Sequence, residues 1–124
     1  MSYVALVTDH FDEVVRFYGE DLCFPVVSQW DRSNARGLRF DVGGMRLEII
    51  DNAREQKPLA LGAPADRFHI VIEVDDIDAV RREIKIDAPP AQTTSWDARI
   101  FQVRDPDDVS VTFLQWIETE SEER

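Results

Sequence analysis

In the segment Phe68-His69-Ile70-Val71-Ile72-Glu73-Val74-Asp75-Asp76, β-branched and aromatic residues are followed by two aspartates. Such a run predicts a strand that leads through a capping turn into a helix. The earlier stretch Tyr3-Val4-Ala5-Leu6-Val7-Thr8-Asp9-His10-Phe11 aligns with it without a gap, so that Tyr3 falls opposite His69 and Asp9 opposite Asp75. The sequence therefore predicts two copies of one structural module.

The first copy continues with a helix and three strands. Asp9 is the expected N-cap of the helix, and Pro25 ends it. Apolar residues recur at helical spacing at Val14, Phe17, Tyr18 and Leu22. The expected strands are Val26–Trp30, Leu38–Val42 and Met45–Ile50, with a polar loop at Asp31–Gly37. Because Gly43-Gly44 is a strong hairpin signal, residues whose numbers sum to 87 should pair, among them Arg39 with Glu48 and Asp41 with Arg46.

The second copy repeats this order. Asp75 or Asp76 should cap a helix that carries Ile77, Val80 and Ile84. The expected strands are a weak one at Gln92–Ser95, then Arg99–Arg104 and Val109–Trp116 around the turn Asp105-Pro106-Asp107-Asp108. The prediction is one α+β domain over residues 1–124, with module one at 1–52, a linker at 53–66, module two at 67–117 and an acidic tail at 118–124. Two βαβββ modules should form facing, curved mixed sheets around a cavity, with the helices outside.

The composition limits which classes of partner and which cellular compartment we expect for this chain. The chain has 25 acidic and 14 basic residues and a net charge of −11, which argues against nucleic acid as a partner. Cys23 is the one cysteine, so no internal disulfide can form, and no basic neighbour suggests an activated thiolate. No segment resembles a signal peptide or is apolar enough to cross a membrane, so we expect a cytoplasmic protein with no membrane partner.

The order and spacing of several short motifs resemble the vicinal oxygen chelate superfamily, which includes glyoxalase I, extradiol dioxygenases, fosfomycin-resistance enzymes and bleomycin-resistance proteins. The matching residues are Val4-Ala5-Leu6 with Asp9, Phe17-Tyr18 with Leu22 and Phe24, Leu47-Glu48, His69 with Val74-Asp75-Asp76-Ile77, and Asp105-Pro106-Asp107. The resemblance covers nearly the whole chain. Two departures are Asp108 and Cys23, which stand where the family usually has glycine.

The resemblance places four metal-ligand positions at Tyr3, Glu48, His69 and Thr112. Glu48 and His69 are sound ligands for zinc, iron, manganese or nickel, whereas a neutral phenol or hydroxyl is a poor one. Arg39 is expected opposite Glu48, where its guanidinium would pair with the carboxylate. We therefore expect no metal; if one binds, Glu48 and His69 are its ligands, and they are also the candidates for acid–base catalysis.

If these four positions mark the inward face of the sheets, strand parity identifies the rest of a ligand-binding trough. The candidate binding residues are Tyr3, Arg39, Glu48, His69, Arg99, Phe101, Thr112 and Trp116, with Phe101 expected opposite Thr112 and Arg99 opposite Leu114. The trough would be aromatic and apolar with a few charges, which is typical of a small-molecule site. Each of Trp30, Trp96 and Trp116 has a simpler explanation in core or dimer packing.

The function expected from these features is metal-free binding of an aromatic or amphipathic small molecule, for which an antibiotic is one candidate. The resemblance to bleomycin-resistance proteins, which hold their ligand between two subunits, implies a homodimer. Whether a reaction is catalysed stays open: the alternative is a metal-dependent lyase, isomerase or dioxygenase that uses Glu48 and His69. A third possibility is a dimeric scaffold with no small-molecule role. The charge of the ligand is undecided.

Overall fold

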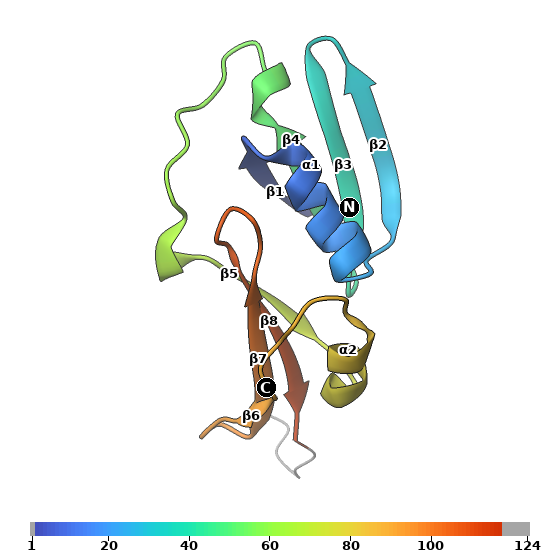
Figure 1. The fold of residues 1–124 in the computed structure, drawn as a ribbon, viewed down its shortest axis with the longest axis vertical. Coiled ribbons are helices and arrows are strands. Elements are labelled where there is room, and N and C mark those ends of the chain that lie inside the picture. Colours follow the sequence, from blue (N-terminus) through green and yellow to red (C-terminus); the bar gives the residue numbers. More distant parts are fainter. Residues whose placement is uncertain (1, 118–124) are drawn as a thin grey trace.

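The computed structural model describes residues 2–117 and contains two βαβββ modules in succession (Figure 1). The elements of the first module are β1 (Tyr3–Thr8), α1 (Phe11–Arg16) continuing as the π-helical segment η1 (Phe17–Asp21), β2 (Val26–Arg32), β3 (Ala35–Val42) and β4 (Met45–Asp51). Those of the second are β5 (His69–Glu73), α2 (Ile77–Glu83), β6 (Gln92–Thr93), β7 (Ala98–Arg104) and β8 (Ser110–Trp116). The α+β class predicted from the repeat is confirmed.

Each module forms one four-stranded mixed sheet, in the orders β1-β4-β3-β2 and β5-β8-β7-β6. The first strand of each module runs parallel to the last, with Ala5 opposite Glu48 and Val71 opposite Thr112. Glu48 and Thr112 therefore occupy equivalent positions, as the repeat predicts. A linker with two short 3-10 turns, η2 (Asn52–Arg54) and η3 (Ala65–Arg67), joins the modules and runs along one side of the molecule (Figure 1).

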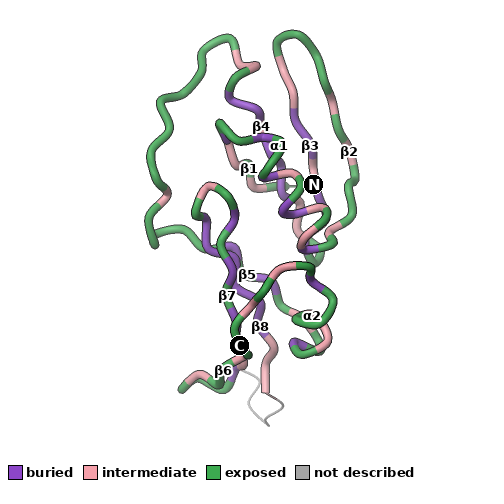
Figure 2. Tube along the Cα trace, in the orientation of Figure 1, coloured by how far each residue is buried: buried purple, intermediate pink, exposed green. Residues whose placement is uncertain are grey.

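The helix-facing sides of the two sheets share one hydrophobic core. Alternate strand residues supply it, as the purple segments of Figure 2 show, because side chains of a strand point to opposite faces. Phe40 and Leu47 from the first sheet and Ile72 and Phe113 from the second belong to the same cluster. The opposite face of each sheet, which we name the open face, carries no helix among residues 2–117. At its edges Tyr3 is 47% and Val71 52% exposed.

Polar contacts also cross the junction between modules. The buried Tyr18 hydroxyl donates to Asp105 Oδ2 at 2.8 Å, and the ring of His10 lies 2.8 Å from Asp107 Oδ1. Both acids belong to the β7–β8 turn, while Tyr18 and His10 belong to the helix of module one and to the residue before it. This turn therefore fixes the second module against the helix of the first.

Two sequence expectations about local structure are wrong. Asp9 does not cap α1, because its carboxylate accepts a hydrogen bond from Asn52 Nδ2 at 2.8 Å, and the N-cap is His10 without a side-chain cap. The Asp31–Gly37 segment is not a loop but the tip of the β2–β3 hairpin, with a turn at Ser33 and Asn34. Its polar residues sit in an edge hairpin where ion pairs such as Arg54–Asp31 at 2.6 Å satisfy them. Asp76 caps α2 as expected, accepting from Ala79 N at 3.1 Å.

The remaining element boundaries agree with the sequence to within a few residues, except that β3 begins three residues earlier than expected. No helix in the described residues is long and apolar enough to cross a membrane. The acidic tail expected at 118–124 lies outside the described residues.

Candidate functional site

The open face of the first sheet carries a compact group of predicted site residues. The β3–β4 register sets Arg39 opposite Glu48, as the glycine hairpin predicts, and β1 places Ala5 beside Glu48. Arg39 Nε donates to Glu48 Oε2 at 2.6 Å, and the Glu48 side chain is only 8% exposed. A short, charge-assisted bond of this kind is stronger than a neutral one. Glu48 is thus held by Arg39, which confirms the pairing inferred from the hairpin.

Arg39 is also enclosed by two aromatic rings. Its guanidinium carbon lies 4.4 Å from the centroid of the Tyr3 ring and 5.1 Å from that of Trp30, within the range of cation–π attraction. The bond to Glu48 raises the pKa of Arg39 above its ordinary value. The guanidinium is therefore permanently charged, and its charge is already balanced by one carboxylate and two aromatic faces.

Trp30 reaches this position because of the residue across the hairpin. β2 and β3 pair Trp30 with Gly37, and a Cβ atom on Gly37 would overlap the indole ring. Glycine lets the indole lie flat against the strand. The sequence favoured core or dimer packing for Trp30 over ligand stacking, and it did not predict the pairing of Trp30 with Gly37 because Asp31–Gly37 was interpreted as a loop.

A shallow depression beside this group has a volume of about 290 Å³ and is lined by Tyr3, Val27, Ser28, Arg39 and Arg46. Arg46 NH1 lies 3.9 Å from Asp41 Oδ2, so the second arginine of this face also has an acidic partner. The depression is half open to solvent on the face that no helix covers. It offers aromatic surface and balanced charge.

The open face of the second sheet holds three of the other predicted residues, His69, Thr112 and Trp116. Thr112 is buried and its hydroxyl accepts a hydrogen bond from Gln102 Nε2 at 2.9 Å. Trp116 Nε1 donates to Glu73 Oε1 at 2.9 Å, and the Trp116 ring meets Trp96 edge-on at 5.5 Å. A depression of about 650 Å³ adjoins this pair at the end of the sheet. Gln102 and the Trp96–Trp116 contact were not predicted.

The expected register of the second hairpin is wrong by one residue. Phe101 pairs with Phe113 and Gln102 with Thr112, while Arg99 pairs with Gln115. The cause is the turn: Asp108 takes a left-handed φ of +66°, and Asp105 Oδ1 accepts from the backbone N–H groups of Asp107 and Val109. This adds a residue to the connection, and a one-residue slip moves every side chain to the other face.

Arg99 and Phe101 therefore leave the predicted trough. Phe101 is buried in the shared core, stacked on Phe113 with ring centroids 5.0 Å apart. Arg99 faces α2 and makes a bidentate pair with Asp78, at 2.9 and 3.0 Å. That pair lowers the pKa of Asp78. Neither side chain lies on the face that carries Thr112, although Arg99 borders the larger depression at the end of the sheet.

The donor set within one chain does not fit a transition-metal site. Glu48 is committed to Arg39, and His69 is exposed with Nε2 3.0 Å from the carbonyl oxygen of Asp66. In residues 2–117 no group of three histidine, cysteine or acidic side chains comes close enough to hold an ion. A catalytic metal normally needs three protein ligands, which these positions do not provide. Nor does any described hydrogen bond join Glu48 to His69.

Comparison with known proteins gives a consistent result. The family model of the Glyoxalase/Bleomycin resistance protein/Dioxygenase superfamily matches residues 1–113. The uncharacterized protein YraH of Bacillus subtilis (strain 168) is 24% identical over 115 residues, covering 84% of this chain and 88% of that protein.

Solved structures agree with the fold. A glyoxalase/bleomycin resistance protein/dioxygenase from Nocardioides superimposes with a TM-score of 0.70 at 19% identity, covering 100% of this chain and 89% of the other. The fosfomycin resistance protein FosX of Listeria monocytogenes does so with a TM-score of 0.68 at 12% identity, covering 97% and 93%. At these identities the likeness shows the fold alone.

Proposed function

The chain belongs to the Glyoxalase/Bleomycin resistance protein/Dioxygenase superfamily, and on that premise we propose that it is a metal-free protein that binds a small aromatic or amphipathic molecule on its open faces. The observation that carries this proposal is the Tyr3–Arg39–Trp30 stack closed by Glu48. It presents aromatic surface to a depression, and the carboxylate that the family's fold offers to a metal is held by a guanidinium instead. Aromatic surface with a few fixed polar groups suits a small organic ligand.

The charges on the open faces favour a neutral or cationic ligand. Three arginines on these faces already have acidic partners: Arg39 with Glu48, Arg46 with Asp41, and Arg104 with Asp66 at 2.7 Å. Glu73, in contrast, accepts a hydrogen bond from the neutral indole of Trp116 and has no ion pair among the described residues. An anionic ligand would have to displace an existing ion pair, whereas a cationic ligand would meet a carboxylate that no described cation balances.

A homodimer completes the proposed site. Tyr3 and Val71 lie at open faces that no helix covers, and both are about half exposed. Large exposed apolar side chains rimmed by polar groups are typical of interaction surfaces. A second copy laid over these faces would enclose a ligand that one chain leaves open to solvent. The resemblance to bleomycin-resistance proteins, which bind between two subunits, leads to the same assembly.

The second candidate function is enzymatic. The family includes dioxygenases by name, and FosX is by its name a fosfomycin resistance protein. Glu48 is a buried carboxylate on one open face and His69 an exposed imidazole on the other, so two copies could bring them together. This candidate requires that Glu48 release Arg39.

A ligand titration tests the proposal. A panel of neutral, cationic and anionic aromatic compounds is added while tryptophan fluorescence is recorded, and light scattering gives the mass of the same samples. We expect a dimer and saturable responses to neutral or cationic members. Tyr3→Ala should weaken binding about tenfold, since it removes one aromatic contact worth about 1 kcal/mol plus buried area.

The matched control is Leu59→Ala, which shortens an equally exposed apolar side chain in the linker and should leave binding unchanged. A panel that gives no saturable response, or one in which only carboxylates bind, contradicts the proposal. Equal loss of affinity in both variants would show that the stack of Tyr3 on Arg39 is not the site.

A further inference from the structure

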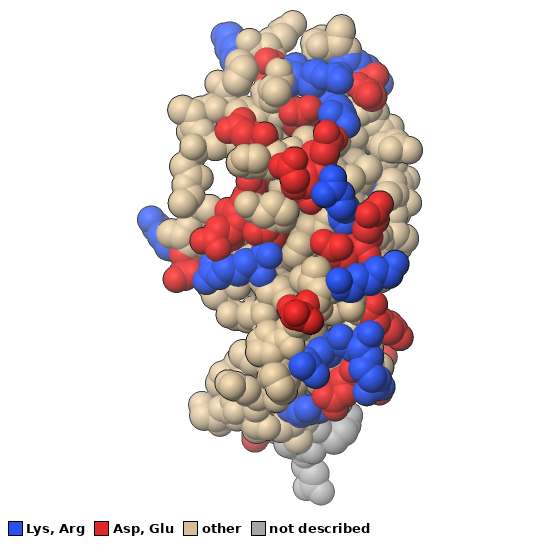
Figure 3. Space-filling view, in the orientation of Figure 1, with Lys and Arg blue, Asp and Glu red and all other residues tan. Residues whose placement is uncertain are grey.

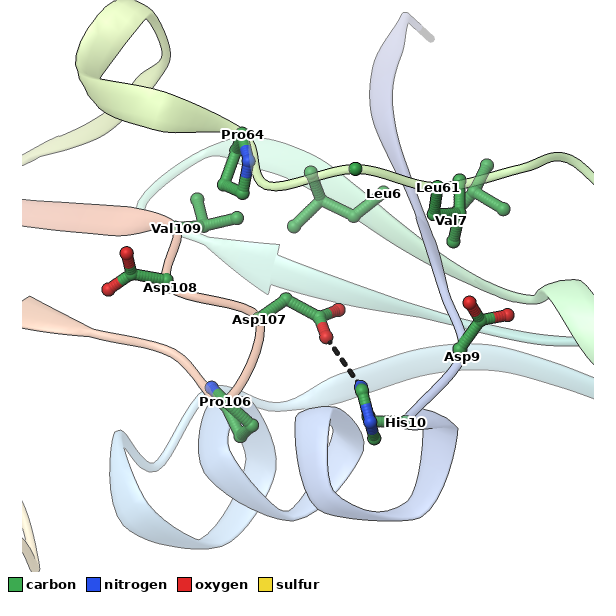
Figure 4. A pocket seen from close by; sticks show the side chains of 11 residues that line it. Leu6, Val7, Asp9, His10, Leu61, Pro64, Pro106, Asp107, Asp108 and Val109 are labelled. Atoms are coloured by element: carbon green, nitrogen blue, oxygen red, sulfur yellow. Dashed lines mark hydrogen bonds and ion pairs between the residues drawn. The ribbon is translucent and has the colours of Figure 1, made fainter.

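A third pocket, separate from the depressions on the two open faces, lies where the linker crosses the end of β1 (Figure 4). Its volume is about 420 Å³, which lies within the range of small-ligand sites. Three separate parts of the chain build it: the end of β1, the linker, and the β7–β8 turn. The pocket thus exists only when the two modules are docked.

The walls of this pocket are apolar. Leu6 and Val7 come from β1, Leu61 and Pro64 from the linker, and Val109 from the turn. Val109 is buried, whereas Leu61 is 39% exposed. Figure 4 shows these side chains around one space, with the linker passing over it. An apolar wall of this kind favours a ligand with a hydrocarbon body.

The polar lining is acidic. Asp9, Asp107 and Asp108 border the pocket, and Figure 3 shows carboxylates beside the linker among the acidic and basic groups spread over this side of the molecule. Asp9 accepts from the neutral amide of Asn52, which leaves its charge uncompensated. Asp108 lies 3.6 Å from Arg104, which also pairs with Asp66. The lining therefore carries more negative charge than its neighbours balance.

Asp107 has a titratable partner. Its Oδ1 lies 2.8 Å from His10 Nδ1, and Asp9 and Glu13 also lie near this ring. The hydrogen bond to Asp107 is the main cause that raises the pKa of His10, since the protonated ring donates to the carboxylate. At lower pH the imidazolium balances Asp107; at higher pH the histidine is neutral and the carboxylate keeps its full charge.

We propose that this linker pocket binds an organic cation with an apolar body, and that the cation competes with protonated His10 for Asp107. The apolar walls take the hydrocarbon part, and Asp9 and Asp107 face the ammonium group. This site is independent of the one on the open faces. It follows that binding is coupled to pH: affinity rises as the pH rises through the titration of His10, because a bound cation and a proton on His10 exclude one another.

Nuclear magnetic resonance with two isosteric probes tests this inference. Benzylamine, which is cationic, and benzyl alcohol, which is neutral, are each titrated into ¹⁵N-labelled protein. We expect benzylamine to shift the amide signals of Gly62, Asp107 and Val109 in a saturable way, at millimolar concentration, whether or not it also shifts the Trp116 indole signal, which reports binding at the open faces. Benzyl alcohol should give much smaller shifts at the same amides. Equal shifts from both probes would overturn the proposal, as would shifts confined to Trp116.

Two variants test whether the Asp107 carboxylate binds the cation and whether the proton on His10 competes with it. Asp107→Asn should weaken benzylamine binding about threefold, in the range of an exposed ion pair. The control Asp87→Asn removes one charge at an exposed position outside the pocket and should have little effect, because salt screens distant charges. His10→Gln should abolish the rise in affinity between pH 5.5 and 8. Equal losses in the two aspartate variants, or pH dependence that survives His10→Gln, would contradict the proposal.

Discussion

At the scale of single residues, the decisive contact is the one between Arg39 and Glu48. The resemblance noted in the sequence implies a metal-ligand position at Glu48, but the carboxylate lies 2.6 Å from the guanidinium of Arg39. Two rings confine that guanidinium further. One arginine on the neighbouring strand thus holds the carboxylate that the resemblance assigns to a metal, which is why we propose recognition of an aromatic ligand here instead.

Removing that carboxylate tests its role. Glu48→Ala should lower the free energy of unfolding by about 1–3 kcal/mol, because it leaves the guanidinium of Arg39 partly buried without its acceptor. Urea denaturation followed by circular dichroism measures the loss. The control Asp31→Ala breaks the exposed pair with Arg54 and should cost no more than about 0.5 kcal/mol. If the two variants lose the same free energy of unfolding, the pair of Arg39 with Glu48 stabilises the fold no more than an exposed ion pair does.

The sequence predicted this contact because hairpin arithmetic is reliable when the turn is unambiguous. Gly43 and Gly44 both adopt positive φ, at +67° and +92°, so the pairing of Arg39 with Glu48 follows from their numbers. It did not predict Trp30 in the stack, because that contact depends on a hairpin whose turn residues, Ser33 and Asn34, give no comparable signal.

At the scale of elements, the β7–β8 turn has two roles. It sets the register that sends Phe101 and Arg99 to the helix-facing side, and it carries the acids that contact module one. The extra residue was not predictable from the pattern, since Asp108 occupies a left-handed position where a glycine would have signalled it. A single residue in a turn therefore decided whether two predicted site residues were right.

The buried bond between Tyr18 and Asp105 makes a prediction about pH. Burial raises the pKa of Asp105, while bonds from Val109 N and Tyr18 lower it. The pKa of Asp105 is higher in the folded protein than its value of 3.8 in the unfolded chain. The folded state therefore loses stability as the pH rises between these two pKa values. Tyr18→Phe removes one bond that lowers the pKa, so it should cost about 1–3 kcal/mol at pH 7 and less at pH 4.

Urea denaturation at the two pH values measures this difference. The double variant Tyr18→Phe with Asp105→Asn serves as the control, because asparagine keeps the oxygen that accepts the turn amides but does not titrate. In a chain that carries Asp105→Asn, the free energy of unfolding lost on Tyr18→Phe should be the same at pH 4 and at pH 7. An effect of Tyr18→Phe that is equal at pH 4 and pH 7 would contradict the coupling.

At the scale of the whole molecule, the two modules share a core through their helix-facing sides and leave their open faces without a cover in one chain. The repeat predicted both modules and their order, because periodicity and turn signals are local. The repeat could not predict which face of each sheet enters the shared core, because neighbouring strand residues that point to opposite faces, such as Tyr3 and Val4, are similarly apolar. The linker pocket was equally hidden from the sequence, as three distant segments form it.

Metal analysis of the purified protein tests whether Arg39 keeps a metal ion from binding to Glu48. Protein prepared without chelator is incubated with iron, zinc, manganese and nickel salts, desalted and analysed by mass spectrometry of its metal content. We expect less than one metal ion per chain, and the same metal content in Glu48→Ala, because Arg39 already binds the carboxylate. One equivalent of a transition metal per chain, lost in Glu48→Ala and His69→Ala, would contradict this expectation and favour the enzymatic alternative.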